Sequence, residues 1–510
     1  MNFDLQVLDD LEVSDDVAEK SESSIAASDP FGRGRKIKNT SSICPQCLEP
    51  VDAKVFERQG EVWMDKTCAH HGQFSALLSS DIRHYFEPRA RSSRSPGPGA
   101  SCCGSSCSLA ASEGLTGANT APWINHSCTI LIEITERCNL SCPTCFAGSS
   151  PHHSKVMSLE EFTRQVDQLV AEGKSNADMI QLSGGEPTIH PHLFEMVDLL
   201  FERGFHKVCI NSNGIKLARP AFTERLANCM NRHPEDRIFV YLQFDGFEAS
   251  THARLRGRED LLQIKRRALE NCQARGIRVH PVMTLTRDIN DHEVGDFVRL
   301  AVENPALKNV VIQPAMYSGR YDNTRRQDRL TLADTVTLIC DQFGVFSPED
   351  FVPIPCSDPN CFGMAVAIRT GNGLLPVSRY FPRHESWDSD EARDLIDRFS
   401  DTIDGPQAIS EAIRWASSDE RLQPLLQGLD SPDVDRLLDA LIEHQTDAGD
   451  IWDRLLTISI KPFMDAWTYD QDRVDQCCVH VLDMDGKPVS FCEFNAITRP
   501  RMAGVKVINA

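Results

Sequence analysis

The sequence predicts an α/β fold: a parallel sheet with crossover helices, preceded by a small metal-binding module and followed by a mostly helical region. Apolar runs of strand length alternate with amphipathic segments of helical length through the middle of the chain, a pattern typical of parallel strands joined by helices. Cysteines flank a short alternating stretch near the N-terminus and gather again near the C-terminus. We therefore expect an acidic disordered tail, a metal module, a linker, a core and a C-terminal region, at residues 1–40, 41–88, 89–126, 127–322 and 323–510.

The composition disfavours several classes of protein. The 510 residues include 53 Lys and Arg against 74 Asp and Glu, a net charge of −21 at pH 7, which argues against a nucleic-acid partner. We find no apolar run long enough to cross a membrane and no signal peptide. The sequence thus predicts a cytoplasmic protein without a transmembrane segment, leaving peripheral membrane contact open. Because that compartment keeps thiols reduced, we interpret the clustered members of the 19 cysteines as metal ligands.

The N-terminal module is predicted from two cysteine-bearing turns around a hairpin. Cys44 and Cys47 precede an alternating stretch at 51–64, and Cys68 follows it. Two such turns hold one metal ion tetrahedrally in zinc ribbons and rubredoxins, so iron and zinc are both candidates. The fourth ligand stays open among His71, Cys102, Cys103 and Cys107. The last three lie beside a Pro, Gly and Ser-rich linker, so exposed linker thiols are the alternative interpretation for them.

Six strands and five helices are expected in the core. We place the strands at 129–134, 179–182, 207–211, 238–244, 279–285 and 310–313. The helices are placed at 158–172, 192–202, 221–230, 261–275 and 292–302. In parallel β/α barrels the functional residues lie on loops at the carboxyl ends of the strands, so each of those loops is a candidate.

The loop after the first strand carries three closely spaced cysteines, Cys138, Cys142 and Cys145. Iron–sulfur clusters are held by cysteine thiolates, and a cubane has four irons to ligate. Three protein ligands would therefore leave one iron open for another ligand. A structural zinc site is the alternative, because Cys-x-x-Cys pairs also bind zinc.

The next three strands end in glycine-rich or polar loops. Their motifs are SGGEPT at 183–188, NSNG at 211–214 and QFDG at 243–246. Glycines let a backbone approach a ligand closely, and the Glu186 carboxylate can pair with an ammonium group. Ser212 and Asn213 can hydrogen-bond a ribose or a carboxylate. Each loop alone is an ordinary turn, but three in strand order behind the cysteines favour a cofactor site.

A second group of cysteines follows the sixth strand and recurs near the C-terminus. A cubane without an open iron could be completed by Cys356, Cys361, Cys492 and either Cys477 or Cys478. The alternative is one zinc ion that fastens the C-terminus to the barrel. The intervening stretch from about 390 to 455 is expected to be helical.

Together these motifs resemble one branch of the radical S-adenosylmethionine (SAM) superfamily, which contains the archaeal tetraether lipid synthases and the related pterin methylases. The resemblance runs from Ile43 to Asn495 and includes CNLSCPTCFA at 138–147 and FMDA at 463–466. It implies a partial (βα)6 radical SAM barrel, a rubredoxin-like or zinc-ribbon-like module and auxiliary [4Fe–4S] ligands in the C-terminal region.

The resemblance also implies roles for individual residues. The three-cysteine loop would bind a [4Fe–4S] cluster whose open iron chelates SAM, and the aromatic Phe146 after it fits the pattern. Gly184, Gly185 and Glu186 would receive the amino group of SAM, and Asp245 stands at a ribose-binding position. No side chain is assigned to the catalytic step itself.

The activity implied is reductive cleavage of SAM to a 5′-deoxyadenosyl radical, which abstracts hydrogen from an unactivated carbon. We expect C–C bond formation or methylation on a lipid or pterin-like substrate, with flavodoxin or ferredoxin as the electron donor. A radical SAM oxidoreductase or maturase acting on a peptide or other small molecule is one alternative. The other is an electron carrier without SAM chemistry, which Glu186 and the three-cysteine loop disfavour.

Overall fold

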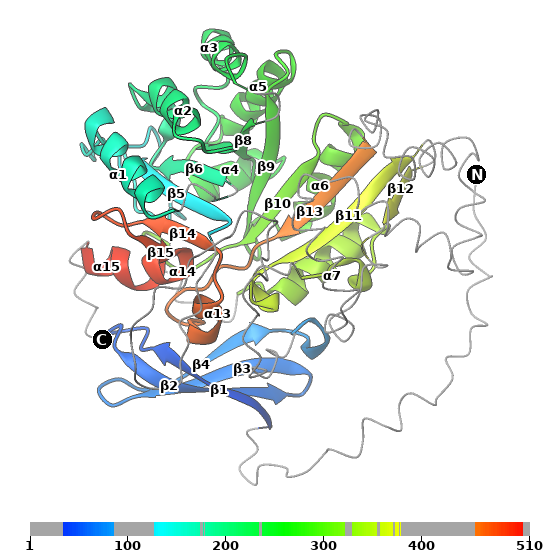
Figure 1. Ribbon diagram of the computed structural model, residues 1–510. Coiled ribbons are helices and arrows are strands. Elements are labelled where there is room, and N and C mark those ends of the chain that lie inside the picture. The colour runs from blue at the N-terminus through cyan, green and yellow to red at the C-terminus, as the bar shows by residue number, and fades with distance from the viewer. Residues whose placement is uncertain are drawn as a thin grey trace, which may run out of the picture.

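The computed structural model describes residues 34–85, 127–173, 177, 179–233, 237–321, 329–353, 357–370, 373–376, 378 and 454–502. They form a four-stranded antiparallel sheet and an eleven-stranded mixed sheet (Figure 1). Several expectations lie outside these residues: the tail up to residue 33, the linker, the helical stretch from 390 to 453, and Cys102, Cys103, Cys107 and Cys356.

The N-terminal module is the four-stranded sheet, whose strands follow one another in chain order. They are β1 (Arg35–Ile43), β2 (Pro50–Arg58), β3 (Glu61–Cys68) and β4 (Gly72–Ser79), followed by the short helix η3 (Ile82–His84). Gln59 and Gly60 join β2 to β3 with φ of 54° and 84°, the left-handed pair that a two-residue hairpin turn requires. The sheet begins at Arg35, earlier than the boundary expected from composition, because β1 pairs along its length with β2.

The core of the large sheet is a run of six parallel strands in chain order, as the sequence predicts. These are β5 (Thr129–Thr135), β6 (Met179–Gly184), β7 (Val208–Ser212), β8 (Ile238–Gln243), β9 (Arg278–Leu285) and β10 (Asn309–Pro314). The connecting helices are α1 (Leu159–Ala171), α2 (Leu193–Glu202), α3 (Pro220–Met230), α4 (Ala249–Arg256), α5 (Leu261–Gln273) and α6 (Val294–Glu303). The sequence analysis did not foresee α4.

The helices bury their apolar faces against the sheet. In α1, Phe162, Val166 and Leu169 are fully buried, and they pack in one cluster with strand residues such as Ile132 and Leu182. Ser158 caps α1 by accepting a hydrogen bond from the Glu161 N–H at 3.0 Å, as its sequence signature indicates. The large apolar cluster continues through all six parallel strands and fixes the strand ends where the candidate site lies.

The C-terminal region adds strands to both edges of the sheet. After α7 (Leu332–Phe343), strands β11 (Gly363–Thr370), β12 (Gly373–Pro376) and β13 (Leu455–Ile460) extend the sheet beyond β10, with β13 parallel to β10. On the other edge β14 (Val479–Leu482) pairs in parallel with β5, and β15 (Pro488–Ser490) follows it. The described part of this region therefore contains strands that the sequence analysis did not predict.

The four-stranded sheet contacts the C-terminal segment that carries α13 (Gln471–Asp475), as Figure 1 shows. Lys38 on β1 pairs with Asp470 at 2.7 Å and with Asp472 at 3.0 Å. Lys66 on β3 is buried and donates to the Ala466 carbonyl at 2.7 Å. Residues far apart in sequence thus join the metal module to the end of the chain. Among the described helices, none has the length and apolar character needed to span a bilayer.

Candidate cofactor and metal sites

The three cysteines at 138, 142 and 145 lie on the loop that leaves the end of β5. The loop turns tightly, with the Cys145 N–H donating to the Cys142 carbonyl at 3.2 Å. Arg320, which follows the end of β10, donates hydrogen bonds to this loop. Its Nε donates to the Cys142 carbonyl and its backbone N–H donates to the Cys145 carbonyl, both at 3.0 Å. The sequence analysis gave Arg320 no role at the site.

The three thiols are spaced more widely than a single zinc ion requires. Among the described residues, they do not belong to any group of His, Cys, Asp and Glu whose ligand atoms all lie within 4.8 Å of one another. A tetrahedral zinc ion with Zn–S bonds of about 2.3 Å would need a tighter group. Burial raises the pKa of Cys138 to about 12, and the negative charge of Glu186 contributes to this rise. Metal binding must therefore displace a proton from this thiol.

Gly184 and Gly185 bring the SGGEPT loop against the start of the cysteine loop. A Cβ on Gly184 would lie 2.2 Å from the Thr135 carbonyl oxygen, and one on Gly185 would lie 2.1 Å from that of Arg137. The backbone N–H groups of Gly185 and Glu186 donate to these same two carbonyls, at 2.6 and 3.0 Å. Because these two residues are glycines, the backbone of the SGGEPT loop can lie directly against the backbone of the cysteine loop.

Glu186 is buried, with 1% of its surface exposed, and its carboxylate is held by the loop after β7. Its Oε1 accepts from the Ser212 hydroxyl at 2.9 Å, and its Oε2 accepts from the Asn213 N–H at 2.8 Å. Burial raises the pKa of Glu186, while the hydrogen bonds from Asn213, Thr188 and Ser212 lower it. The structure therefore joins two motifs that the sequence analysis assigned separately to the cofactor.

Asn213 extends the same contacts to the cysteines. Its Nδ2 donates to Asn139 Oδ1 at 2.6 Å and lies 3.8 Å from the Cys138 sulfur. Its Oδ1 accepts from the Ile215 N–H at 3.1 Å. Glu186, Ser212 and Asn213 are thus linked by hydrogen bonds to the first cysteine of the loop.

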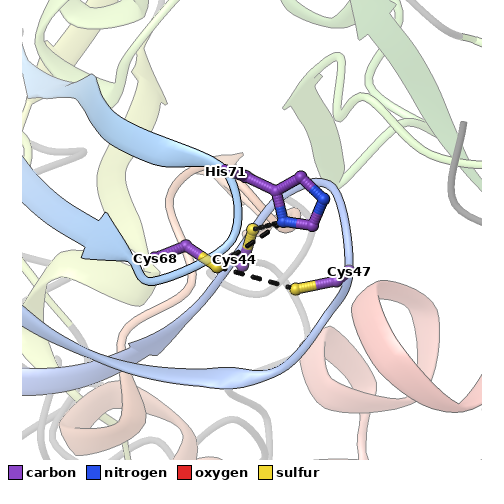
Figure 2. A group of neighbouring side chains, drawn as sticks. All are labelled: Cys44, Cys47, Cys68 and His71. Atoms are coloured by element: carbon purple, nitrogen blue, oxygen red, sulfur yellow. Dashed lines mark hydrogen bonds between the residues drawn. The ribbon is translucent and has the colours of Figure 1, made fainter. Parts of the chain in front are cut away.

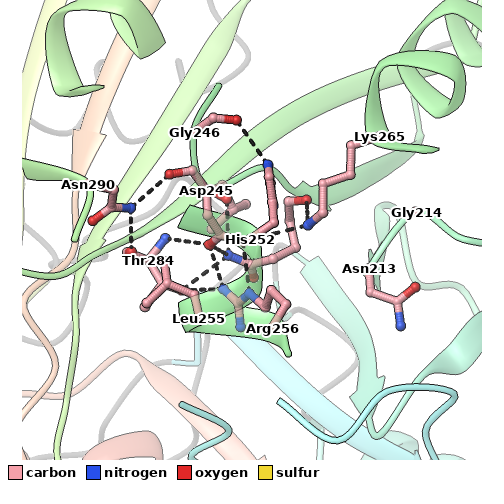
Figure 3. A network of polar contacts seen from close by, with 12 residues as sticks. Asn213, Gly214, Asp245, Gly246, His252, Leu255, Arg256, Lys265, Thr284 and Asn290 are labelled. Atoms are coloured by element: carbon pink, nitrogen blue, oxygen red, sulfur yellow. Dashed lines mark hydrogen bonds and ion pairs between the residues drawn. The ribbon is translucent and has the colours of Figure 1, made fainter. Parts of the chain in front are cut away.

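Asp245 lies at the centre of a buried ionic network at the end of β8 (Figure 3). Arg256 Nε donates to its Oδ2 at 2.8 Å, Gln243 Nε2 donates to its Oδ1 at 2.8 Å, and Lys265 Nζ lies 3.6 Å from Oδ2. Burial would raise the pKa of Asp245, but the charges of Arg256 and Lys265 outweigh it and hold that pKa well below its usual range. The carboxylate expected at a ribose-binding position is therefore already engaged by the protein.

Arg256 belongs to this network and also acts on the cysteine loop through its positive charge. It ends α4, and its side chain contacts Asp245 while its charge acts on the thiol of Cys142. Burial raises the pKa of Cys142, and Arg256 lowers it. Sequence periodicity missed this residue because α4 is short and polar, so it has no apolar stripe to detect. The left-handed C-cap Gly257 after it, with φ of 79°, is a signal that could have marked the helix end.

Phe146 lies in the apolar cluster of the C-terminal region. Its ring meets that of Phe491 edge to face, with centroids 5.8 Å apart. The cluster also contains Met316, Met464 and Val481. This residue, expected beside the cofactor, thus also links the cysteine loop to the end of the chain.

The N-terminal module brings four potential ligands together (Figure 2). The ligand atoms of Cys44, Cys47, Cys68 and His71 all lie within 4.8 Å of one another. His71 Nδ1 is 3.6 Å from the Cys44 sulfur and 3.5 Å from that of Cys68, and the Cys47 and Cys68 sulfurs are 3.8 Å apart. Of the candidates for the fourth ligand, His71 is the one that lies here among the described residues. Three sulfurs and one imidazole nitrogen form a common structural zinc donor set.

The C-terminal cysteines form a third group around Arg473. Burial raises the pKa of Cys361, and the charges of Cys492 and Cys477 contribute to the same rise. Cys492 is buried and accepts from the Met464 N–H at 3.3 Å. The charge of Cys477 acts on both Cys361 and Cys492.

A small pocket with about 40 Å³ of free volume lies between the N-terminal module, the carboxyl end of β10 and the loop before Cys361. Its walls include the aromatic side chains of Tyr85 and Phe463 and the polar side chains of Arg329, Asn360 and Thr468. It is therefore on the face of the barrel where the parallel strands end.

Three features characterise the protein. The partial barrel carries three cysteines after its first strand and a glycine-rich acidic loop after its second, and the N-terminal module brings four potential metal ligands together. The chain belongs to the radical SAM superfamily, whose profile matches residues 132–301. The profile of the HMPTM N-terminal zinc ribbon domain matches residues 36–80. The protein is thus a radical SAM enzyme.

Individual relatives extend the comparison. The 7,8-dihydro-6-hydroxymethylpterin dimethyltransferase of Methanocaldococcus jannaschii is 30% identical over 499 residues, covering 91% of this chain and 94% of the relative. The GTP 3′,8-cyclase of Desulforamulus reducens is 29% identical over 184 residues, covering 34% of this chain and 51% of the cyclase. Among solved structures, Streptococcus suis SuiB bound to precursor peptide SuiA is 18% identical, with a TM-score of 0.35, and covers 42% of this chain and 45% of SuiB.

Proposed function

We propose that this protein is a radical SAM methyltransferase that acts on a reduced pterin bearing a hydroxymethyl group. The observation that carries the proposal is the similarity to the pterin dimethyltransferase over nearly the whole of both chains. That similarity includes the N-terminal module and the C-terminal region as well as the barrel, so it concerns the parts that distinguish one radical SAM enzyme from another.

We assign the SAM-binding [4Fe–4S] cluster to Cys138, Cys142 and Cys145. When bound, the cluster and SAM supply the 5′-deoxyadenosyl radical. The residues present fit this assignment, because the three thiols are near enough for the charges of Cys142 and Cys145 to act on Cys138, and the buried carboxylate of Glu186 acts on it as well. Arg256 supplies positive charge beside the thiols and so favours their ionised form.

Glu186 is the residue that we assign to the ammonium group of SAM. Ser212 and Asn213 hold its carboxylate in one orientation before any ligand binds. A buried carboxylate is costly, and an ammonium partner relieves that cost. Gly184 and Gly185 keep the loop close enough to the cysteine loop for one ligand to reach both. Asp245 acts behind the site by fixing Arg256 and Lys265.

The metal assignments at the two ends of the chain differ in kind. For the N-terminal module we propose one structural zinc ion held by Cys44, Cys47, Cys68 and His71. For the C-terminal region we propose an auxiliary [4Fe–4S] cluster whose described ligands are Cys361, Cys477 and Cys492. Cys356, which the sequence analysis predicts as the fourth ligand, lies outside the described residues.

The net reaction replaces a carbon-bound hydrogen of the pterin by a methyl group from a one-carbon donor. The hydrogen atom leaves in 5′-deoxyadenosine, and an external one-electron reductant such as flavodoxin or ferredoxin supplies the electrons.

The test is an anaerobic assay of the reconstituted enzyme with SAM, dithionite and 6-hydroxymethyl-7,8-dihydropterin, followed by mass spectrometry. A parallel reaction with methyl-labelled SAM shows whether SAM is the one-carbon donor. We expect a methylated pterin that forms together with 5′-deoxyadenosine. Formation of 5′-deoxyadenosine without pterin product, together with product from a lipid extract or a peptide, would contradict the proposed substrate.

A further inference from the structure

Arg473 lies in the interior of the protein, between the C-terminal cysteines and the N-terminal module. Its side chain is 11% exposed, and its Nε donates to the Cys361 sulfur at 3.3 Å. A second nitrogen of the guanidinium donates to the Pro462 carbonyl at 3.2 Å. The guanidinium stays protonated at any accessible pH, so this contact places a full positive charge beside a sulfur that we assign to the auxiliary cluster.

The nearest carboxylate does not explain this position. Asp358 is completely buried, and its Oδ1 lies 3.9 Å from Arg473 Nε, farther away than the sulfur. Its Oδ2 has no hydrogen-bond partner among the described residues. If Arg473 were oriented to pair with Asp358, its guanidinium would be expected to donate a hydrogen bond to Oδ2 of that residue, because an unpaired buried acceptor is costly. The arginine is instead directed at Cys361.

The N-terminal module holds the segment that presents Arg473. Thr40 donates to Asp470 Oδ1 at 2.7 Å, and Ser42 donates to the Tyr469 carbonyl at 2.6 Å. Asp470 in turn caps α13, the short helix that contains Arg473. The module thus holds the segment that carries Arg473, while the Pro462 carbonyl and the Cys361 sulfur accept hydrogen bonds from the guanidinium itself.

We propose that Arg473 is a positioning residue that sets the reduction potential of the auxiliary cluster through its hydrogen bond to Cys361. The inference rests on the auxiliary cluster of the proposed function. Hydrogen bonds to cluster sulfurs and nearby net charge are among the factors that set the potential of an iron–sulfur cluster. A cationic donor stabilises the reduced cluster, which carries one more electron, and therefore makes the potential more positive.

The experiment is an EPR-monitored redox titration of the reconstituted holoenzyme, with dithionite as the reductant and iron content measured in parallel. Added SAM perturbs the signal of the cluster with the open iron, so the remaining signal identifies the auxiliary cluster. The variants are Arg473→Gln, which removes the charge, and Arg473→Lys, which keeps it but loses the planar donor. Arg232→Gln is the control, because Arg232 pairs with Asp198 at the edge of the outer helices.

We expect a more negative midpoint potential in Arg473→Gln, a smaller change in the same direction in Arg473→Lys, and no change in Arg232→Gln. Equal potentials in the wild-type protein and Arg473→Gln at full iron content would overturn the inference. If Arg473→Gln loses the auxiliary iron, Arg473→Lys decides: a shifted potential supports the inference, and an unshifted one or loss of the iron there too overturns it. A wild-type protein with iron for one cubane only would contradict the auxiliary cluster itself, which is a distinguishable result.

Discussion

Glu186 illustrates how single side chains prepare the proposed cofactor site. Its carboxylate is buried and accepts hydrogen bonds from residues at the end of the neighbouring strand. Thr188 donates to it as well, and none of these three described donors carries a positive charge that would balance the carboxylate. The missing positive charge is what an ammonium group of SAM would provide.

Replacing Glu186 by Gln tests this role. The variant keeps the shape of the side chain but loses a charge-assisted hydrogen bond, worth about 1.5–3 kcal/mol. We therefore expect the affinity for SAM to fall by roughly tenfold or more, measured by anaerobic calorimetry. Asp350→Asn, a change of charge in another fully buried carboxylate, is the control. Equal affinity in Glu186→Gln and the wild-type protein would remove Glu186 from the site.

Gly184 provides a second test at the scale of one residue. Gly184 has a φ of +115° and Gly204 one of +86°, so Ala is strained at either position. Only at Gly184 would the new Cβ also meet a backbone oxygen, that of Thr135 at 2.2 Å, whereas nothing lies within 4 Å at Gly204. We expect Gly184→Ala to weaken SAM binding and to lower the free energy of unfolding more than Gly204→Ala does, in binding and denaturation measurements. Similar effects of both changes would show that the close approach of the loops is unimportant.

At the scale of the elements, the carboxyl ends of the parallel strands carry the candidate site, and side chains along the strands stabilise the sheet. His280 on β9 is stacked on Phe239 of β8, with centroids 4.7 Å apart. Burial, with contributions from the charges of Arg278 and Lys207, lowers the pKa of His280 to about 3. The imidazole is thus neutral in the folded protein under conditions in which an unfolded chain would protonate it.

This difference predicts a pH dependence of stability. Between about pH 3 and the unfolded pKa of about 6.5, the unfolded state binds a proton at His280 that the folded state does not. The free energy of unfolding therefore rises with pH across this window, by at most about 1.4 kcal/mol per pH unit from this group. We expect urea denaturation of His280→Phe to show a weaker pH dependence than the wild-type protein. The exposed-residue change His152→Phe should leave the dependence as it is, and an unchanged slope in His280→Phe would contradict the assignment.

Local sequence patterns were sufficient for the six parallel strands and for the residues at their ends, because each strand and its loop are continuous in sequence. They were not sufficient for β13 and β14, which take their places only by pairing with β10 and β5. Such pairings are decided by tertiary contacts and leave little trace in the short segments themselves. The short polar α4 was missed for a related reason, since it has no apolar periodicity.

At the scale of the whole molecule, one C-terminal segment joins the metal module to the barrel. Asp465 is fully buried and accepts from Arg329 at 2.7 Å and from the Tyr317 N–H at 2.9 Å, both beyond the end of β10. A few residues on, Asp470 binds Lys38 of the module. The sequence identified the cysteines of both regions, but these buried charges became interpretable only when the fold brought their partners together. His71, one of the candidates for the fourth ligand, has its ring nitrogen within 4.8 Å of the three cysteine sulfurs of the module.

The most direct test of the account is SAM cleavage by the protein in which Cys138, Cys142 and Cys145 are all replaced by Ala. The measurement is the yield of 5′-deoxyadenosine under anaerobic conditions with dithionite, together with iron and zinc content. We predict that the triple variant forms no 5′-deoxyadenosine while it keeps the metal of the N-terminal and C-terminal sites. An unchanged yield of 5′-deoxyadenosine in the triple variant would contradict the assignment of this loop to the SAM-binding cluster.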